Sequence, residues 1–296
     1  MPPFLRWLIA LGLVGSAVYW VVTRPDPLSD GDLAGLSGDA TAGEQVFLAA
    51  GCASCHVAPG EQPEGAPVLA GGQKFPSDFG TFLAPNISPS VMAGVGSWTD
   101  RELASAIQRG VSPEGYHYYP AFPYDAYGKA DTGDIVNLIA YLRTLPESEQ
   151  PSQPHEVSFP FDIRRNLGGW KTLFISEDWV VEGELTETQA RGRYLVEALG
   201  HCGACHTPRN LLGGPNTGAW LAGAPNPEGK GRIPNITPGA LTWSEVDIAA
   251  YLATGFTPEF DSAGGQMVAV IDKTSKLQPE DRAAIAAYLK VVPAVE

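Results

Sequence analysis

The longest uninterrupted run of apolar side chains lies near the start of the chain. Residues 4–22 read FLRWLIALGLVGSAVYWVV, in which Arg6 is the only charged residue. Nineteen residues with a helical rise of about 1.5 Å each give about 28 Å, close to the hydrocarbon thickness of a bilayer. We therefore predict one transmembrane helix within residues 1–24. A cleaved signal peptide is the alternative, because Gly15 and Ala17 are small residues before an acceptable cut, but the apolar run continues beyond them.

Beyond this run, apolar positions recur at helical spacing in three pairs of segments. Residues 25–40, before the first of them, are polar and contain Pro and Gly, which is typical of a tether. Each pair has one member in each half of the chain, and the helices of the middle pair start at good N-caps, Thr99 and Ser244. The paired segments are 41–51 with 186–200, 97–115 with 242–260, and 134–146 with 281–293.

The two halves also share a turn motif, which indicates a duplicated domain. APNISP at 84–89 matches IPNITP at 233–238, and the middle pair of segments aligns without a gap. We therefore divide the chain into five parts. These are an anchor at 1–24, a tether at 25–40, domains at 41–146 and 186–296, and an inter-domain segment at 147–185.

All four cysteines lie in two copies of the pattern C-x-x-C-H. Two intervening residues let one turn of chain bring both thiols to one porphyrin edge, and the adjacent imidazole then lies under the iron as the proximal ligand. Zinc sites and thioredoxin-like pairs do not require a histidine directly after the second cysteine, whereas both motifs of this chain have one. We predict two covalently bound haem c groups. The predicted attachment residues are Cys52, Cys55 and His56, and Cys202, Cys205 and His206.

The composition limits the kinds of partner. A chain of 296 residues with 44% hydrophobic content can build two cores. The net charge of −14 disfavours nucleic acid and favours a basic protein surface as the partner. An acidic surface that only maintains solubility is the alternative.

The order of these features resembles a known family. An N-terminal helix, C-x-x-C-H, a long loop and a closing helix with AYL resemble the class I cytochrome c fold, seen twice. The arrangement of PNI(S/T)P, W(T/S), PAxPY and AYL is similar to dihaem cytochromes c related to the cytochrome subunits of membrane-bound alcohol, gluconate and sugar dehydrogenases. The resemblance covers about residues 40–293 and implies an all-α fold, with two tandem class I cytochrome c domains after one N-terminal transmembrane helix. Many of those subunits have three haem domains, whereas this chain has two.

The two domains differ at the position opposite the proximal histidine. Class I cytochromes c usually place a methionine sulfur there. Met267, the only methionine after the second motif, is predicted to be that ligand. It lies 24 positions after Trp243, and the position 24 after Trp98 is Phe122. The resembling family most often has methionine there, as PAMPY, so the first haem has lost its expected sulfur ligand.

Three replacements for this ligand are open. His117, five residues earlier, would give a bis-histidine haem with a lower potential than the second haem. Met92 has suitable chemistry but lies upstream of the tryptophan. The third is an open or weakly held site with Lys129 or water, covered by Phe122. The predicted iron ligands are His56, His206, Met267 and His117, with Met92 as the runner-up.

Other polar residues have two interpretations each. Arg164 and Arg165, in the aromatic part of the inter-domain segment, could neutralise haem propionates or be solvated surface arginines. Asn86 and Asn235, in the PNI turns, could shape the haem pockets or form ordinary Asx-turns. NLGGWKTLF in the same inter-domain segment predicts a short helix.

These features predict a membrane-tethered dihaem cytochrome that passes single electrons between a dehydrogenase or quinol-oxidising complex and a soluble carrier or terminal oxidase. Haem c is attached outside the cytoplasmic membrane, so in a bacterium the haem domains would lie in the periplasm on a single-pass inner-membrane anchor. No nucleotide-binding glycine motif is present, and we do not expect an enzyme. The alternative is a dihaem peroxidase-like enzyme with an open first haem. A free carrier and a stable subunit of a larger complex are both consistent with the sequence.

Overall fold

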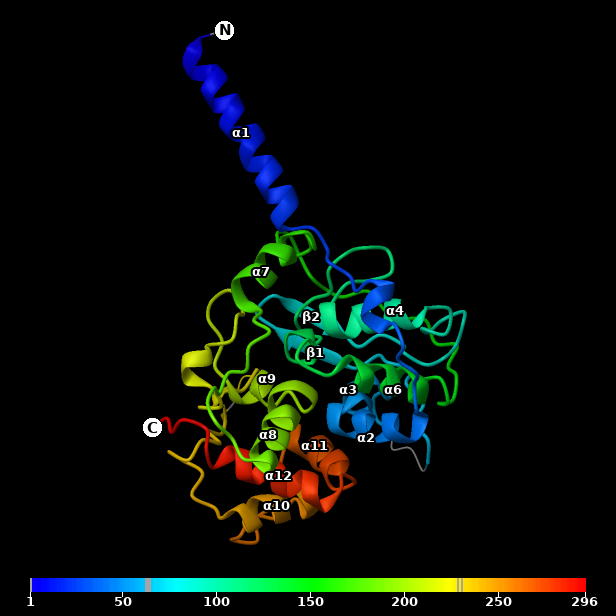
Figure 1. Ribbon diagram of the computed structural model, residues 1–296, viewed down its shortest axis with the longest axis vertical. Helices are drawn as coiled ribbons and strands as arrows, with labels where there is room; N and C mark the ends of the chain where they lie inside the picture. The colour runs from blue at the N-terminus through cyan, green and yellow to red at the C-terminus, as the bar shows by residue number, and fades with distance from the viewer. Residues whose placement is uncertain (1, 62–64, 228, 230) are drawn as a thin grey trace.

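One helix, α1 (Pro3–Val22), projects away from the rest of the molecule in the computed structural model (Figure 1). The structure describes residues 2–61, 65–227, 229 and 231–296. Within these ranges, α1 is the one helix that is long and apolar enough to cross a membrane, and none of its residues is buried. The apolar run near the start of the chain is therefore a continuous helix with apolar side chains exposed along its length.

The polar segment 25–40 lies along the first domain. Leu28 is buried, and its amide donates a hydrogen bond to Ser105 Oγ at 3.1 Å. A short 3-10 turn, η1 (Asp30–Leu33), follows. These contacts hold the start of the segment against the domain that follows it.

The first domain is closed by two helices that cross at a glycine. α2 (Ala40–Ala50) packs against α6 (Thr132–Leu142), and each begins at an aspartate whose carboxylate accepts a backbone N–H. A Cβ atom on Gly43 would lie 1.9 Å from the carbonyl oxygen of Asn137. Only glycine lets the two backbones approach this closely.

The second domain repeats this crossing. α8 (Glu187–Arg193) continues into a π-helical turn, η3 (Tyr194–Leu199), and packs against α12 (Pro279–Leu289). A Cβ atom on Gly192 would lie 1.9 Å from the carbonyl oxygen of Ala284. The repeat in the sequence thus corresponds to a repeat in the packing.

The middle helix of each domain begins as the sequence predicts. α4 (Asp100–Ala104), which continues as the π-helical turn η2 (Ser105–Arg109), starts after Thr99, and α10 (Glu245–Thr254) starts after Ser244. Each hydroxyl accepts the amide of the residue three positions on, whose carboxylate accepts the cap's own amide. Both are complete capping boxes, and the prediction of the two N-caps is confirmed.

Two short antiparallel hairpins interrupt an otherwise helical fold. β1 (Lys74–Ser77) pairs with β2 (Gly80–Leu83), and β3 (Ala224–Pro225) pairs with β4 (Arg232–Ile233). The mostly helical class is as predicted, but the hairpins were not expected. Strands of two to four residues are too short to show an alternation of polar and apolar positions.

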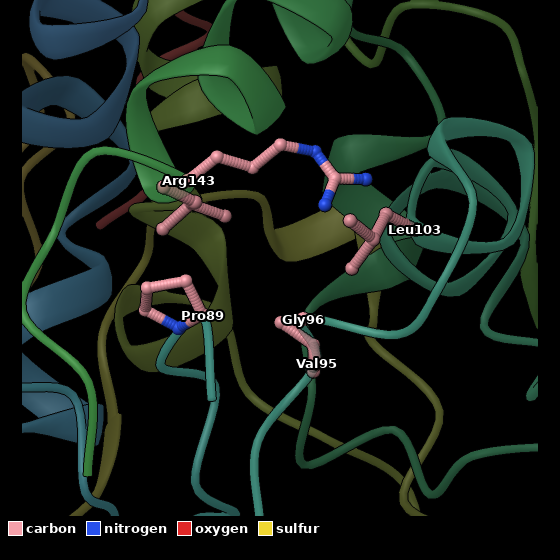
Figure 2. A pocket seen from close by; sticks show the side chains of 6 residues that line it. Pro89, Val95, Gly96, Leu103 and Arg143 are labelled. Atoms are coloured by element: carbon pink, nitrogen blue, oxygen red, sulfur yellow. The ribbon is translucent and has the colours of Figure 1, made fainter. Parts of the chain in front are cut away.

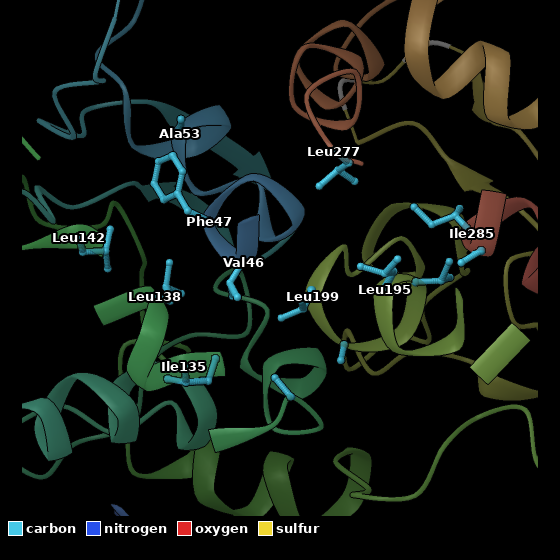
Figure 3. Packing of buried hydrophobic residues seen from close by; sticks show 14 of the residues in the cluster. Val46, Phe47, Ala53, Ile135, Leu138, Leu142, Leu195, Leu199, Leu277 and Ile285 are labelled. Carbon is cyan, nitrogen blue, oxygen red and sulfur yellow. The ribbon is translucent and has the colours of Figure 1, made fainter. Parts of the chain in front are cut away.

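A single hydrophobic core runs through both domains. Figure 3 shows Val46 and Phe47 of the first domain in the same cluster as Leu195 and Leu199 of the second.

The predicted inter-domain helix is present as α7 (Asn166–Phe174) and lies at the foot of α1 (Figure 1). The remaining helical elements are α3 (Cys52–His56), α5 (Tyr124–Tyr127), α9 (Gly203–His206), η4 (Thr217–Ala219) and α11 (Met267–Thr274).

Candidate haem-binding sites

The two C-x-x-C-H motifs form short helical turns directly after the first helix of each domain. These turns are α3 (Cys52–His56) and α9 (Gly203–His206), and all four cysteines are free thiols. Gly71 donates its amide to the His56 carbonyl at 2.7 Å, and Gly223 does the same to the His206 carbonyl at 2.7 Å. The chain therefore holds both turns in the same way.

A backbone carbonyl orients each motif histidine. Nδ1 of His56 lies 2.8 Å from the carbonyl oxygen of Pro85, and Nδ1 of His206 lies 2.8 Å from that of Pro234. A carbonyl oxygen can only accept, so Nδ1 carries the proton and Nε2 keeps its lone pair. Burial also lowers the pKa of both imidazoles, which favours their neutral form. Each ring is thus prepared to bind a metal through Nε2.

The repeated asparagines fasten these same turns. The side-chain oxygens of Asn86 and Asn235 accept the amide two residues further on, at 2.9 and 2.8 Å. Their amide groups donate to the chain that follows the closing helix, to the Ser148 carbonyl at 2.8 Å and the Val295 carbonyl at 2.7 Å. The Asx-turn interpretation is therefore the one the structure supports. The role of the PNI motif, to place a carbonyl under the histidine, was not predicted, although its occurrence in both halves was a signal.

These residues fit haem c. Each site offers two free thiols in one turn of chain and an imidazole whose Nε2 is left for iron. When bound, haem c supplies an iron centre that gains and loses one electron. The chain's own contribution is to fix the proximal imidazole and to surround the site with the apolar core.

The two methionine candidates lie in different surroundings. Met267 is the first residue of α11 and is partly buried. That helix lies beside the first motif, because Ser54 donates its hydroxyl to the Ala269 carbonyl at 3.3 Å. Met92 is 86% exposed, so its side chain faces solvent. The assignment of Met267 to the second haem stays a prediction.

Phe122, where a methionine ligand would be expected, lies in an aromatic cluster. Its ring centroid is 6.2 Å from Tyr118, 6.3 Å from Tyr124 and 5.9 Å from Tyr127. The hydroxyl of Tyr127 donates to the carbonyl of Ala50 at 3.0 Å, at the end of the helix that leads into the first motif. The cluster therefore packs directly beside the first haem site.

His117, the candidate replacement ligand, is hydrogen-bonded to the residue that ends α1. It is 2% exposed, and its Nε2 donates to the carbonyl oxygen of Thr23 at 3.0 Å. Its Nδ1 is buried without a hydrogen-bond partner. Iron ligation through Nε2 would require this hydrogen bond to break, and the assignment of His117 as a ligand stays a prediction.

Lys129, the other candidate near the first haem, belongs to a buried ion pair between the domains. Its ammonium lies 3.4 Å from Oε2 of Glu197, and both side chains are buried. Glu197 also accepts the amides of Val180 and Val181, at 2.6 and 3.1 Å, and the hydroxyl of Tyr288. Sequence reasoning missed this group, for which the one signal was a glutamate inside the apolar helix YLVEAL.

Neither inter-domain arginine is a freely solvated surface group. Arg164 donates to the His117 carbonyl at 3.3 Å. Arg165 donates to Thr23 Oγ1 at 2.8 Å and to the Trp20 carbonyl at 2.6 Å, with its guanidinium 4.1 Å from the Trp20 ring centroid. Arg165 therefore fastens the end of α1 to the inter-domain segment, and Arg164 fastens this segment to the first domain.

A cleft in the first domain is too small to bind a substrate. It lies between the loop after the PNI turn, α4 and the end of α6 (Figure 2), and its volume is about 10 Å³. This is room for about one water molecule. Its lining residues are Pro89, Val95, Gly96, Leu103, Leu142 and Arg143.

The fold and these two sites define a dihaem c-type cytochrome, built from two helical domains that each hold one C-x-x-C-H turn. A model of the family described as "Cytochrome c" matches residues 40–146 and 189–293. The chain belongs to the cytochrome c family, with two covalently bound haem c groups and a role in electron transfer.

Relatives are similar over most of the chain. The protein "Diheme cytochrome c-type" of Cereibacter sphaeroides is 54% identical over 288 residues, which is 97% of both chains. The "Fructose dehydrogenase cytochrome subunit" of Gluconobacter japonicus is 39% identical over 85% of this chain and 52% of its own length. The "Alcohol dehydrogenase (quinone), cytochrome c subunit" of Gluconobacter oxydans is 34% identical over 86% of this chain and 54% of its own length. The chain thus spans about half the length of these two dehydrogenase subunits.

Proposed function

We propose that this cytochrome is held at the bacterial inner membrane by α1 and works in the periplasm. There it passes single electrons between a dehydrogenase or quinol-oxidising complex and a soluble carrier or terminal oxidase. The haems are attached at the two C-x-x-C-H turns, with His56 and His206 as proximal ligands. The observation that carries this proposal is the pair of histidines oriented in the same way, each directly after two free thiols and each with Nε2 left to bind iron.

The exposed surface of α1 supports the membrane tether. A helix of 20 residues with a mean hydropathy of 1.7 and no buried residue would place a large apolar area in water. A bilayer removes this area from water at no cost in backbone hydrogen bonds, since a helix satisfies them internally. The hydroxyl of Tyr19 also donates to Asn166 Oδ1 at 2.8 Å, so the base of the helix is fastened to α7.

The names of the relatives support a dehydrogenase as partner. Fructose and quinone-linked alcohol dehydrogenases each have a cytochrome subunit to which more than four fifths of this chain is similar. The net charge of −14 supports a basic surface on one of the redox partners. The peroxidase-like alternative gains no support, because His117, its candidate distal acid or base, is used to hold Thr23.

Membrane attachment is tested by fractionation and intact mass. We expect the full chain to stay with membranes after an alkaline wash and to have the mass of residues 1–296 plus two haems. A variant in which a cleavable signal peptide replaces residues 1–24 should be recovered in the periplasmic extract. Recovery of the wild-type chain in that extract, with a mass that lacks the first residues, would show a cleaved signal peptide instead.

The partner is tested by mild detergent extraction and spectroscopy. We expect the chain to co-purify with a dehydrogenase in fixed ratio, and its haems to be reduced when that enzyme's substrate is added. A matched chain with His56→Ala and His206→Ala controls for reduction that does not use these haems. Purification of the chain alone, with haems reduced by no membrane dehydrogenase, would contradict this part of the proposal.

A further inference from the structure

The first haem turn lies against the helix that carries the predicted ligand of the second haem. Ser54, inside the first C-x-x-C-H motif, donates its hydroxyl to the carbonyl of Ala269 at 3.3 Å. Ala269 belongs to α11, two residues after Met267. α11 also packs against α2, which leads into the first motif. The contact between the domains is therefore made by the segments that hold the haems.

A second contact links the end of α2, which leads into the first motif, to the residue before the second motif. The ring of Tyr127 meets the ring of His201 edge to face, with centroids 5.5 Å apart and planes at 76°. The Tyr127 ring is buried and fixed by its hydrogen bond to the Ala50 carbonyl, two residues before Cys52. His201 directly precedes Cys202. One aromatic pair thus connects the two attachment motifs.

His201 stands where the first domain has Gly51: each residue directly precedes the first cysteine of its motif, and each has a positive φ, +39° for His201 and +64° for Gly51. The glycines at the helix crossings, Gly43 and Gly192, are 149 residues apart, whereas the first cysteines of the motifs, Cys52 and Cys202, are 150 apart. The second domain thus has one residue more before its motif, and the π-helical turn η3 accommodates it within the helix. π-turns and positive φ at a residue other than glycine are uncommon and concentrate at functional sites.

We propose that His201 and Tyr127 are positioning residues that hold the two haem attachment turns together, so that groups attached to these turns would interact. The contact sets how strongly each haem senses the oxidation state of the other. The proposal rests on the assignment of the haems to the two motifs, but not on the membrane tether or on any partner.

The wild-type chain provides the first test. Oxidised low-spin haem is paramagnetic and reduced low-spin haem is not, so close haems shorten each other's spin relaxation only when both are oxidised. We expect faster relaxation in the fully oxidised protein than at a potential where one haem is reduced. Equal relaxation at both potentials, in protein whose mass shows two haems, would overturn the proposal. A missing haem would instead count against the assignment of the motifs.

Substitutions provide the second test. His201→Gly keeps a residue that accepts a positive φ but removes the ring, and Ser54→Ala removes the hydroxyl bonded to Ala269. The charge gained when one haem is oxidised should shift the redox equilibrium of a nearby haem on the order of fivefold. We expect His201→Gly to reduce both this shift and the relaxation effect, and Ser54→Ala to reduce them less.

A third histidine serves as the matched control. His155, in the inter-domain segment, is partly buried, and its ring contacts Phe82 and Tyr119 of the first domain. His155→Ala should leave the interaction between the haems unchanged. If the His201→Gly variant binds two haems and its interaction between the haems is also unchanged, His201 is not a positioning residue. If His201→Gly does not fold, Ser54→Ala and the wild-type measurement still decide the outcome.

Discussion

A buried imidazole joins the end of α1 to the first haem domain. His117 donates from Nε2 to the Thr23 carbonyl, and its other ring nitrogen has no hydrogen-bond partner. The residue therefore has a structural role in this fold, whatever binds the first haem iron. A glutamine at this position separates the two candidate roles of His117. Its side-chain amide can donate to the Thr23 carbonyl, but it does not replace histidine as a haem ligand.

We predict that His117→Ala lowers the stability of the anchor junction by about 1–3 kcal/mol, because the Thr23 carbonyl loses its donor. His117→Gln should retain most of the stability. Hydrogen exchange of the amides around Thr23, in detergent, measures the difference. Equal exchange in the two variants would contradict the structural role.

The same variants test the ligand prediction by low-temperature EPR and near-infrared magnetic circular dichroism. If His117 binds the first iron, a bis-histidine signal is present in the wild type and is lost in both variants, while the signal of the second haem remains. An unchanged spectrum in both variants would contradict the ligand assignment.

A buried lysine in α7 predicts a pH dependence of stability. The ammonium of Lys171 donates to the carbonyls of Arg109 and Gly110 and lies 4.4 Å from the ring centroid of Tyr124. Burial lowers its pKa from 10.5 to about 7, with a further contribution from Arg109. Between pH 7 and 10.5 the unfolded chain therefore binds a proton that the folded chain does not, and stability rises with pH across this window.

We expect Lys171→Met to remove this rise. Between pH 7 and 9.5 the free energy of unfolding should rise by on the order of 2 kcal/mol more in the wild type than in the variant. This amount allows for the partial exposure of the Lys171 side chain. Thermal unfolding at the two pH values, followed by circular dichroism, measures the difference. A variant with the same pH slope as the wild type would show that Lys171 titrates normally.

At the scale of elements, a glycine in α7 sets the position of α1. A Cβ atom on Gly168 would lie 2.6 Å from the backbone of Thr23, whereas one on Gly169 would only touch the Thr23 methyl group at 4.0 Å. The backbone of Thr23 cannot move aside as a flexible side chain could. The two adjacent glycines therefore form a matched pair for substitution.

We predict that Gly168→Ala destabilises the junction by about 1–3 kcal/mol, since the added methyl forces two helices apart. Gly169→Ala should be neutral or slightly stabilising, because alanine is the better helix former. Limited proteolysis at residues 22–28 compares the two variants. Equal cleavage would show that α7 does not hold the anchor.

The second element-scale contact is the ion pair between Lys129 and Glu197. Removing one charge leaves the other buried and unpaired, which costs about 3–5 kcal/mol at a buried pair. We predict a loss of this size for Glu197→Gln and a smaller loss for the double variant Lys129→Met with Glu197→Gln. Thermal unfolding of both single variants and the double variant measures the coupling. A loss in the double variant equal to the sum of the two single losses would show that Lys129 and Glu197 are not coupled.

An exposed ion pair serves as the control for this prediction. Lys276 and Asp272 form an i, i+4 pair at 3.1 Å with both side chains about half exposed. Lys276→Met should change stability by less than about 1 kcal/mol, because exposed pairs contribute little.

At the scale of the molecule, the features carried by local spacing could be predicted from the sequence. The C-x-x-C-H motifs, the capping boxes at Thr99 and Ser244, and the duplication all depend on residues close together in the chain. The Lys129–Glu197 pair, the clamp of Arg165 on Trp20 and the contact of Tyr127 with His201 could not be predicted, because they depend on which distant segments meet. A histidine at 201, where the first domain has Gly51, was visible in the sequence, but its place between the haem turns required the packing of both domains.

The net charge of the molecule predicts how it meets its partners. A dense group of exposed carboxylates lies in the inter-domain segment and at the start of the second domain: Glu177, Asp178, Glu182, Glu184 and Glu187. Fields of this kind speed the association of oppositely charged proteins by about 10- to 1,000-fold, and salt screens them. A basic redox partner should therefore exchange electrons with this protein faster at low ionic strength.

We predict that the second-order rate of electron transfer to a basic soluble cytochrome c falls about tenfold between 10 mM and 300 mM salt. The variant Glu182→Lys with Glu184→Lys should lower the rate at low salt, whereas Glu61→Lys in the first domain should have a smaller effect if docking occurs at the second. Stopped-flow measurements at several ionic strengths separate the two cases. A rate independent of salt would mean that the acidic surface maintains solubility and does not steer the partner.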